Sequence, residues 1–242
     1  MPVLAPAASP KSPARHDASG CAQKHGESIT TRLEKRFVAW GTPRVPSWLQ
    51  TDHLTRLTLL WGAGNIGFAM LAASDSRWLL GIAAMIAMQY LTDLFDGAVG
   101  RARDTGLVRW GFYADHLLDT LFLGSLCLAG AIVSPPSLAL WWMGLAIVSA
   151  AIMASSFLAF GATGKFEIYK AGVGPTEARG LLIALIAVVA FTGTGHFWWS
   201  VPALTVVTTA SLIALAIHTG RVLRTLDMDA KWAASNEKSP AA

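Results

Sequence analysis

Six apolar stretches separated by short polar segments dominate this sequence of 242 residues. Each is long enough, or nearly so, to cross a bilayer as an α-helix, which takes about 20 apolar residues. Only 14% of the residues are charged, whereas a soluble domain averages roughly 25%. The sequence therefore predicts an all-α integral membrane protein with six transmembrane helices. We place them at residues 54–73, 78–99, 112–133, 138–160, 178–194 and 198–217.

Lysine and arginine are distributed unevenly around these stretches. Of the 19 basic residues, all but Arg77 lie on the side of the membrane that holds both termini. Cytoplasmic segments are enriched in Lys and Arg, so we expect cytoplasmic termini, in the inner or plasma membrane if the cell is bacterial. The net charge of +4 then reflects topology and attraction to anionic lipid. No aromatic–basic module indicates a nucleic-acid partner.

The segment before the first stretch has two parts. Residues 1–27 are polar and rich in Pro, Ala and Ser, and we expect a disordered tail. Residues 28–49 begin with apolar side chains on one helical face, which predicts an amphipathic interfacial helix followed by a linker. Packing of this helix against the rest of the protein is the alternative. The predicted organisation is thus a tail (1–27), a helix and linker (28–49), a six-span domain (50–222) and a cytoplasmic C-terminal tail (223–242).

Four aspartates lie in the run 93-DLFDGAVGRARDTGLVRWGFYADHLLD-119. Asp93 and Asp96 are three residues apart, and Asp115 and Asp119 are four apart, so each pair shares one face of a helix. Carboxylates at the edge of the hydrocarbon are costly unless they are compensated. Because a short loop makes the two helices antiparallel, the pairs can face each other as an all-oxygen site. Such a site favours Mg²⁺, Mn²⁺ or Ca²⁺ over zinc, and two ions about 3.5–4 Å apart would clamp a pyrophosphate.

Three glycines and an arginine share these helix faces. Gly97, Gly100 and Arg101 fall on the arc of the first aspartate pair, and Gly111 lies one turn before the second pair. The glycines leave space for a ligand near the backbone, and the arginine offers a forked donor for phosphate. Alone, each of these residues is more typical of helix packing or membrane anchoring. Their order among four aspartates points to a phosphate-binding metal site.

This run resembles the signature of the CDP-alcohol phosphotransferases, D-x2-D-G-x2-A-R-x8 or 9-G-x3-D-x3-D, with Gly100 in place of the family's alanine. The resemblance implies that Asp93, Asp96 and Asp115 hold two ions, Mg²⁺ or Mn²⁺. Asp119 would contribute to the second ion and act as the general base on the acceptor hydroxyl.

The same resemblance implies the substrates and the rest of the site. Gly97 and Arg101, with Gly100 and Gly111 beside them, would bind the CDP part of a CDP-linked alcohol. The hydroxyl of an acceptor alcohol would attack the β-phosphorus, and CMP would leave. One of the two alcohols is a membrane lipid, and the resemblance also suggests a homodimer.

Two short segments, 115-DH-116 and 174-GPTE-177, are similar to the choline/ethanolamine phosphotransferase branch of that family. On this weaker resemblance, four residues would lie near the acceptor or the metal site: His116, Lys170, Glu177 and Arg179. The structural alternatives are an interfacial histidine for His116 and a helix-capping carboxylate for Glu177.

Three functional hypotheses follow. The first is phospholipid synthesis from CDP-ethanolamine or CDP-choline and diacylglycerol. The second reverses the arrangement, so that CDP-diacylglycerol donates a phosphatidyl group to glycerol phosphate, serine or inositol phosphate, and Lys165, Lys170 and Arg179 bind an acceptor phosphate. The third is an ion or proton transporter that uses intramembrane carboxylates. It predicts acidic residues through the whole bilayer depth, whereas here they gather at the inner ends of two spans.

Overall fold

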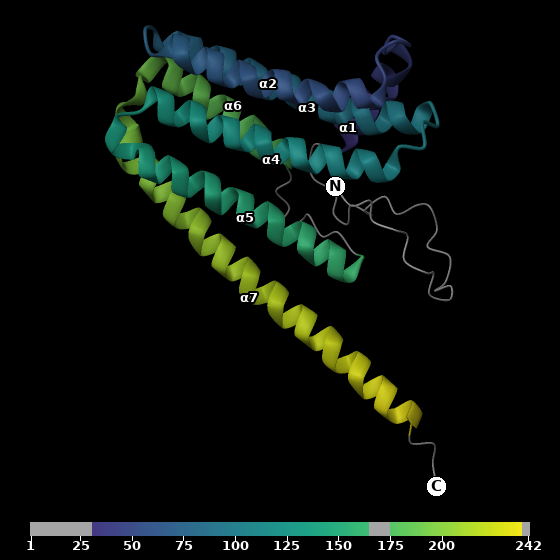
Figure 1. The fold of residues 1–242 in the computed structure, drawn as a ribbon. Helices are drawn as coiled ribbons and strands as arrows, with labels where there is room; N and C mark the ends of the chain where they lie inside the picture. The colour runs from purple at the N-terminus through teal and green to yellow at the C-terminus, as the bar shows by residue number, and fades with distance from the viewer. Residues whose placement is uncertain (1–30, 165–174, 239–242) are drawn as a thin grey trace, which may run out of the picture.

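The computed structural model describes residues 31–164 and 175–238, which form helices joined by short turns (Figure 1). No strand occurs in these residues, which confirms the all-α prediction. The α-helices are α1 (Thr31–Gly41), α2 (Thr51–Ala72), α3 (Leu79–Ala102), α4 (Val108–Val133), α5 (Ala139–Thr163), α6 (Pro175–Thr192) and α7 (Phe197–Lys238).

Successive long helices alternate in direction. At one end of the molecule, 3-10 turns connect α2 to α3, α4 to α5 and α6 to α7: η2 (Ser76–Trp78), η3 (Pro136–Leu138) and η4 (Thr194–His196). The opposite end holds α1, its 3-10 turn η1 (Thr42–Arg44) and the α3–α4 loop (Figure 1). The aspartates of α3 and α4 therefore lie at the end where α1 lies.

Four helical segments are long and apolar enough to cross a membrane: Ser76–Ala102, Val108–Val133, Pro136–Thr163 and Thr194–Trp232. Large apolar side chains cover their outer faces, and Leu140 and Leu158 are 74% and 73% exposed. Such surfaces are costly in water and suit lipid. The membrane architecture is thus confirmed. The predicted first and fifth spans form α2 and α6, which are not among these four, so the count of six stays a prediction for them.

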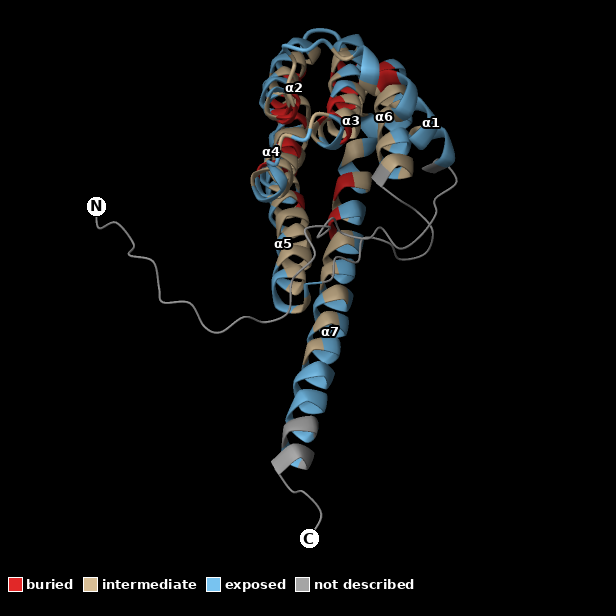
Figure 2. Cartoon of the chain, turned by 90° about the vertical axis from the view of Figure 1, so that its right-hand side faces the viewer, coloured by how far each residue is buried: buried red, intermediate tan, exposed pale blue. Residues whose placement is uncertain are grey.

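A bundle of α2, α3, α4 and α6 contains most of the buried residues (Figure 2). In it, α2 packs against both α3 and α4, and α6 packs against α3. Its core lies toward the η2 end, where Leu79, Ile82 and Ile86 of α3 meet Phe122 of α4 and Ala190 of α6. Gly62 of α2 faces Ser125 of α4, and a Cβ at this glycine would make an ordinary van der Waals contact of 3.5 Å with the Ser125 hydroxyl oxygen.

The pair formed by α5 and α7 diverges from this bundle (Figures 1 and 2). Near η3 and η4 the two helices are held together by a hydrogen bond of 3.3 Å from the Thr205 hydroxyl to the Trp141 carbonyl. The Trp142 and Phe197 rings also contact at 5.8 Å between centroids. α7 has 42 residues and continues beyond the predicted span through much of the predicted 223–242 tail.

The predicted amphipathic helix corresponds to α1, which uses its apolar face in two ways. Phe37 packs edge-on against Phe95 of α3, with ring centroids 5.5 Å apart. Leu33 and Trp40 are 67% and 58% exposed, as an interfacial helix requires. Part of the apolar face of α1 therefore packs against the protein, and another part is exposed as expected for a helix at the membrane interface. The predicted tail 1–27 and the first residues of the predicted helix lie outside the described residues.

Arg103 fastens the α3–α4 loop to the linker before α2. Its guanidinium donates to the carbonyls of Leu49 and Val45 at 2.8 Å and of Pro46 at 3.1 Å. We expect Arg103→Ala to lower the free energy of unfolding by about 1.5–3 kcal/mol, the range for hydrogen bonds to a charged group. Thermal unfolding in detergent measures the loss, and Arg109→Ala, at an exposed position on α4, is the control. Equal shifts in the two variants would contradict this role.

Candidate metal and phosphate site

Three carboxylates from two helices converge at the α1 end of the bundle. Asp93 and Asp96 of α3 and Asp115 of α4 each place one carboxylate oxygen within 4.8 Å of the others. The α3–α4 loop allows this approach because it turns within residues 103–107, where Gly106 has a φ of 68°. We refer to these three residues as the aspartate triad.

Asp96 is held by two threonines of α2. The Thr55 hydroxyl donates to Asp96 Oδ2 at 2.8 Å, and the Thr51 hydroxyl donates to the Asp96 carbonyl at 2.6 Å. Both threonines are buried, and they lie one helical turn apart on the face of α2 that contacts α3. Helix α2 therefore fixes one member of the triad, a role that its sequence did not indicate.

Arg179 of α6 joins the two aspartate pairs. Its Nη1 lies 2.8 Å from Asp93 Oδ2, and its Nη2 lies 3.9 Å from Asp119 Oδ2. The guanidinium also lies 5.7 Å from the centre of the Tyr90 ring. Arg179 was expected near the site from the weaker resemblance, and the structure brings it into direct contact with two of the four aspartates.

Asp119 lies beside the triad rather than in it. Its Oδ1 accepts a hydrogen bond of 2.8 Å from Gln89 Nε2, while Oδ2 faces Arg179. Gln89 is 1% exposed and lies one turn before Asp93 on α3. Gln89 was not among the predicted site residues, although its spacing of four residues from Asp93 places both side chains on the same helix face.

His116 adjoins the triad from α4. Its Nδ1 lies 3.3 Å from Asp115 Oδ2, and its ring packs against Phe112 and Phe157 with centroids 4.2 and 4.8 Å apart. The imidazole is therefore held in place by aromatic contacts on the side of Asp115.

The predicted CDP-binding residues differ in their surroundings. A Cβ on Gly97 would lie 3.3 Å from Arg101 Nη1, so the Arg101 guanidinium lies over this glycine, and Gly111 has open space around it. Gly100, which was expected to face the ligand, instead packs against α2, because a Cβ there would lie 3.2 Å from the Thr51 hydroxyl oxygen. The smaller residue at this position thus accommodates Thr51.

Of the remaining predicted residues, only Glu177 lies within the described part of the chain. Glu177 is in the first turn of that helix, where a carboxylate is favoured by the helix dipole. Lys165 and Lys170 lie outside the described residues, as does Gly174 of the 174-GPTE-177 segment.

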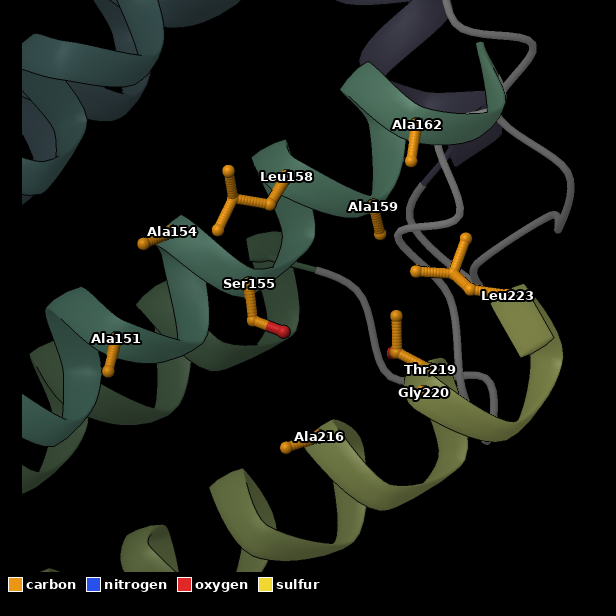
Figure 3. Close-up of a pocket in the computed structure, with 10 residues that line it drawn as sticks. All are labelled: Ala151, Ala154, Ser155, Leu158, Ala159, Ala162, Ala216, Thr219, Gly220 and Leu223. Atoms are coloured by element: carbon orange, nitrogen blue, oxygen red, sulfur yellow. The ribbon is translucent and has the colours of Figure 1, made fainter. Parts of the chain in front are cut away.

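A groove of about 570 Å³ between α5 and α7 does not contain the aspartates (Figure 3). Small and apolar side chains line it, among them Ala154, Leu158, Ala216 and Gly220. Its polar side chains are those of Ser155 and Thr219, and no charged side chain is among its described lining residues. The converging carboxylates lie elsewhere, on α3 and α4.

The donor set of the triad fits a hard divalent cation. Four carboxylates gather here, and Arg179 supplies a single positive charge to Asp93 and Asp119. The excess of negative charge at the edge of the hydrocarbon calls for further compensation. Oxygen donors from three carboxylates are the ligands that Mg²⁺ and Mn²⁺ prefer.

A family model described as CDP-alcohol phosphatidyltransferase matches residues 52–219. The chain belongs to the CDP-alcohol phosphatidyltransferase family. No curated protein and no solved structure matches it.

Family membership gives the aspartate triad a chemical context. The CDP-alcohol phosphatidyltransferases transfer a substituted phosphate group from a CDP-alcohol to an acceptor alcohol, and they use a divalent metal. The whole run from Asp93 to Asp119 lies inside the matched region, as do Thr55, Gln89 and Arg179. The family match does not distinguish the choline/ethanolamine branch, which stays a prediction.

Proposed function

We propose that this CDP-alcohol phosphatidyltransferase is a membrane enzyme of phospholipid synthesis that acts at the aspartate triad. The observation that carries the proposal is the convergence of three carboxylate oxygens within 4.8 Å, next to Asp119 and Arg179. Membership in a transferase family favours catalysis over the ion-transport hypothesis. Asp93, Asp96 and Asp115 would hold the cation, and a second ion would lie toward Asp119. When bound, these ions neutralise the pyrophosphate of the donor.

The chain's own residues would perform the remaining steps. Arg101 and Gly97, at the open end of α3, bind the CDP part of the donor. Asp119 accepts the proton of the acceptor hydroxyl, whose oxygen forms the new bond to the β-phosphorus. The bond from this phosphorus to the CMP oxygen breaks, and CMP leaves with that electron pair. Such a transfer depends on in-line positioning and charge neutralisation more than on covalent catalysis.

We propose that both termini and the site face the cytoplasm. The support is the distribution of basic residues, because within residues 31–164 and 175–238 only Arg77 lies at the η2 end of the bundle. A soluble CDP-alcohol or a soluble acceptor would then reach the aspartates from the cytoplasm.

We propose diacylglycerol as the acceptor and CDP-ethanolamine or CDP-choline as the donor. A cavity of about 230 Å³ between α1, α3 and α6 supports a lipid substrate. Leu33, Phe37 and Leu94 contribute apolar lining, and Tyr90 connects it to Arg179. The short segments that contain His116 and Glu177 support the aminoalcohol donor.

Transfer of a phosphatidyl group to a small polar alcohol is the second candidate. The contact of Arg179 with Asp93 and Asp119 favours it, because a guanidinium at this position can bind the phosphate of glycerol phosphate or inositol phosphate. In this arrangement CDP-diacylglycerol is the donor, and Asp119 accepts the proton of the hydroxyl of the small alcohol.

The test is CMP release by the purified protein in lipid nanodiscs with Mg²⁺ or Mn²⁺. One set of reactions contains CDP-ethanolamine or CDP-choline with diacylglycerol. The other contains CDP-diacylglycerol with glycerol phosphate, serine or inositol phosphate. We expect CMP in one set and none after the divalent cation is removed with EDTA, because the triad needs the cation to bind the pyrophosphate. CMP release in EDTA, or none in any reaction by folded protein, would overturn the proposal.

A further inference from the structure

Gln89 is a buried polar side chain whose position packing alone does not explain. It is 1% exposed, in a helix of membrane-spanning length and hydropathy. Burying an amide costs free energy unless its hydrogen bonds are made. A methionine of similar size would fill the same space without that cost.

The amide makes a hydrogen bond to Asp119. Its Nε2 donates to Asp119 Oδ1 at 2.8 Å, whereas its Oε1 has no hydrogen-bond partner among the described residues. One half of the amide is therefore unsatisfied, and the half that is satisfied lies on the proposed base. The free-energy cost of burying this amide is therefore offset only by the hydrogen bond that Nε2 donates.

This hydrogen bond gives the two oxygens of Asp119 different roles. With Oδ1 held by Gln89, Oδ2 is the oxygen on the side of Arg179, 3.9 Å from Nη2. Arg179 in turn contacts Asp93 at 2.8 Å, so Oδ2 is directed toward the triad. Without this restraint, the Asp119 carboxylate would rotate about its Cβ–Cγ bond. Its Oδ2 would then point toward the triad for a smaller fraction of the time.

We propose that Gln89 is a positioning residue that holds Asp119 so that Oδ2 alone faces the acceptor hydroxyl. This inference rests on the proposed function, in which Asp119 is the base. The proton of the hydroxyl moves to Oδ2, and the Gln89 amide keeps its hydrogen bond to Oδ1 throughout. Gln89 belongs to neither the triad nor the motif that begins at Asp93.

The test compares Gln89→Met, which removes the donor at nearly constant volume, with Ile86→Val, a packing change at a buried position one turn away. We expect Gln89→Met to lower kcat about 10- to 100-fold, as the loss of one hydrogen bond to a charged group implies. The KM for the CDP-alcohol and the affinity for Mn²⁺, measured by electron paramagnetic resonance, should change less than about twofold. Ile86→Val should leave kcat within about twofold of the wild-type value.

A length-compensating pair makes the test specific to this contact. Gln89→Asn shortens the donor by one methylene, and Asp119→Glu lengthens the acceptor by one. Gln89→Asn should therefore cost less kcat in the Asp119→Glu background than in the wild type. Equal costs in both backgrounds, wild-type kcat in Gln89→Met, or a parallel loss of Mn²⁺ affinity would overturn the inference. If the wild-type protein released no CMP from any substrate pair, the proposed function itself would have failed, and this inference with it.

Discussion

Asp115→Ala is expected to abolish both divalent-cation binding and CMP release. Asp115 is the one member of the triad that α4 contributes, and its carboxylate oxygen lies within 4.8 Å of those of Asp93 and Asp96. Without it, the remaining donors of the triad come from α3 alone and no longer enclose its ion. We expect no measurable Mn²⁺ binding at about 100 times the wild-type dissociation constant. The kcat should fall at least about 1000-fold, since bound metal contributes several kcal/mol of charge stabilisation and each ~1.4 kcal/mol is a factor of ten.

Thermal unfolding distinguishes loss of metal from loss of fold. In EDTA, Asp115→Ala should unfold at the wild-type temperature or higher, because removing one of several like charges relieves repulsion. Added Mn²⁺ should stabilise the wild type by about 2.7 kcal/mol at 100 times its dissociation constant, but not the variant. Asp227→Ala, at an exposed position on α7, is the control and should behave as the wild type. Mn²⁺ binding by Asp115→Ala at wild-type affinity would show that the triad is not the metal site.

The convergence of the aspartates follows from helical periodicity and the short loop. Spacings of three and four residues place each pair on one face, and antiparallel helices bring the two faces together. The same geometry separates Asp119 from the triad, because four residues along α4 correspond to a rise of about 6 Å. Asp119 is therefore next to Gln89 and Arg179, one turn further into the membrane than Asp115.

Helical periodicity shows which residues share a face of a helix, but it does not show which neighbouring helix that face contacts. Gly100 shares an arc with Asp93, and so it was expected to face the ligand, but that part of the arc contacts Thr51 of α2. The threonines that hold Asp96 were missed for the same reason, since the sequence does not show which face of α2 meets α3. The position of Arg179 depends equally on how α6 packs against α3. These are properties of tertiary packing, which a single sequence constrains only weakly.

The arrangement also explains how a membrane domain tolerates four carboxylates. Arg179 compensates part of the charge from α6, and Thr55 and Gln89 hydrogen-bond two of the carboxylates. The aspartate triad also lies in the half of α3 and α4 that is nearer to the loop joining them. A bound divalent cation would compensate the rest. The apolar core that contains Ile86 and Phe122 begins one turn from Gln89 and Asp119 and continues toward the η2 end, so the site lies on the α1 side of this core.

Asp119→Asn is expected to stop turnover while leaving the cation bound. Asparagine keeps the shape of the side chain and an oxygen that can accept the Gln89 hydrogen bond, but it cannot take up a proton from the acceptor hydroxyl. General-base catalysis contributes about 10²- to 10⁴-fold, so kcat should fall by that factor. The triad is unchanged, and at least one Mn²⁺ ion per chain should still bind, as judged by electron paramagnetic resonance on the same nanodisc preparation. Asp115→Ala, which loses both properties, is the matched comparison. Turnover within about threefold of the wild type would place the base elsewhere, and loss of all Mn²⁺ binding would make Asp119 an essential metal ligand rather than a base beside the triad.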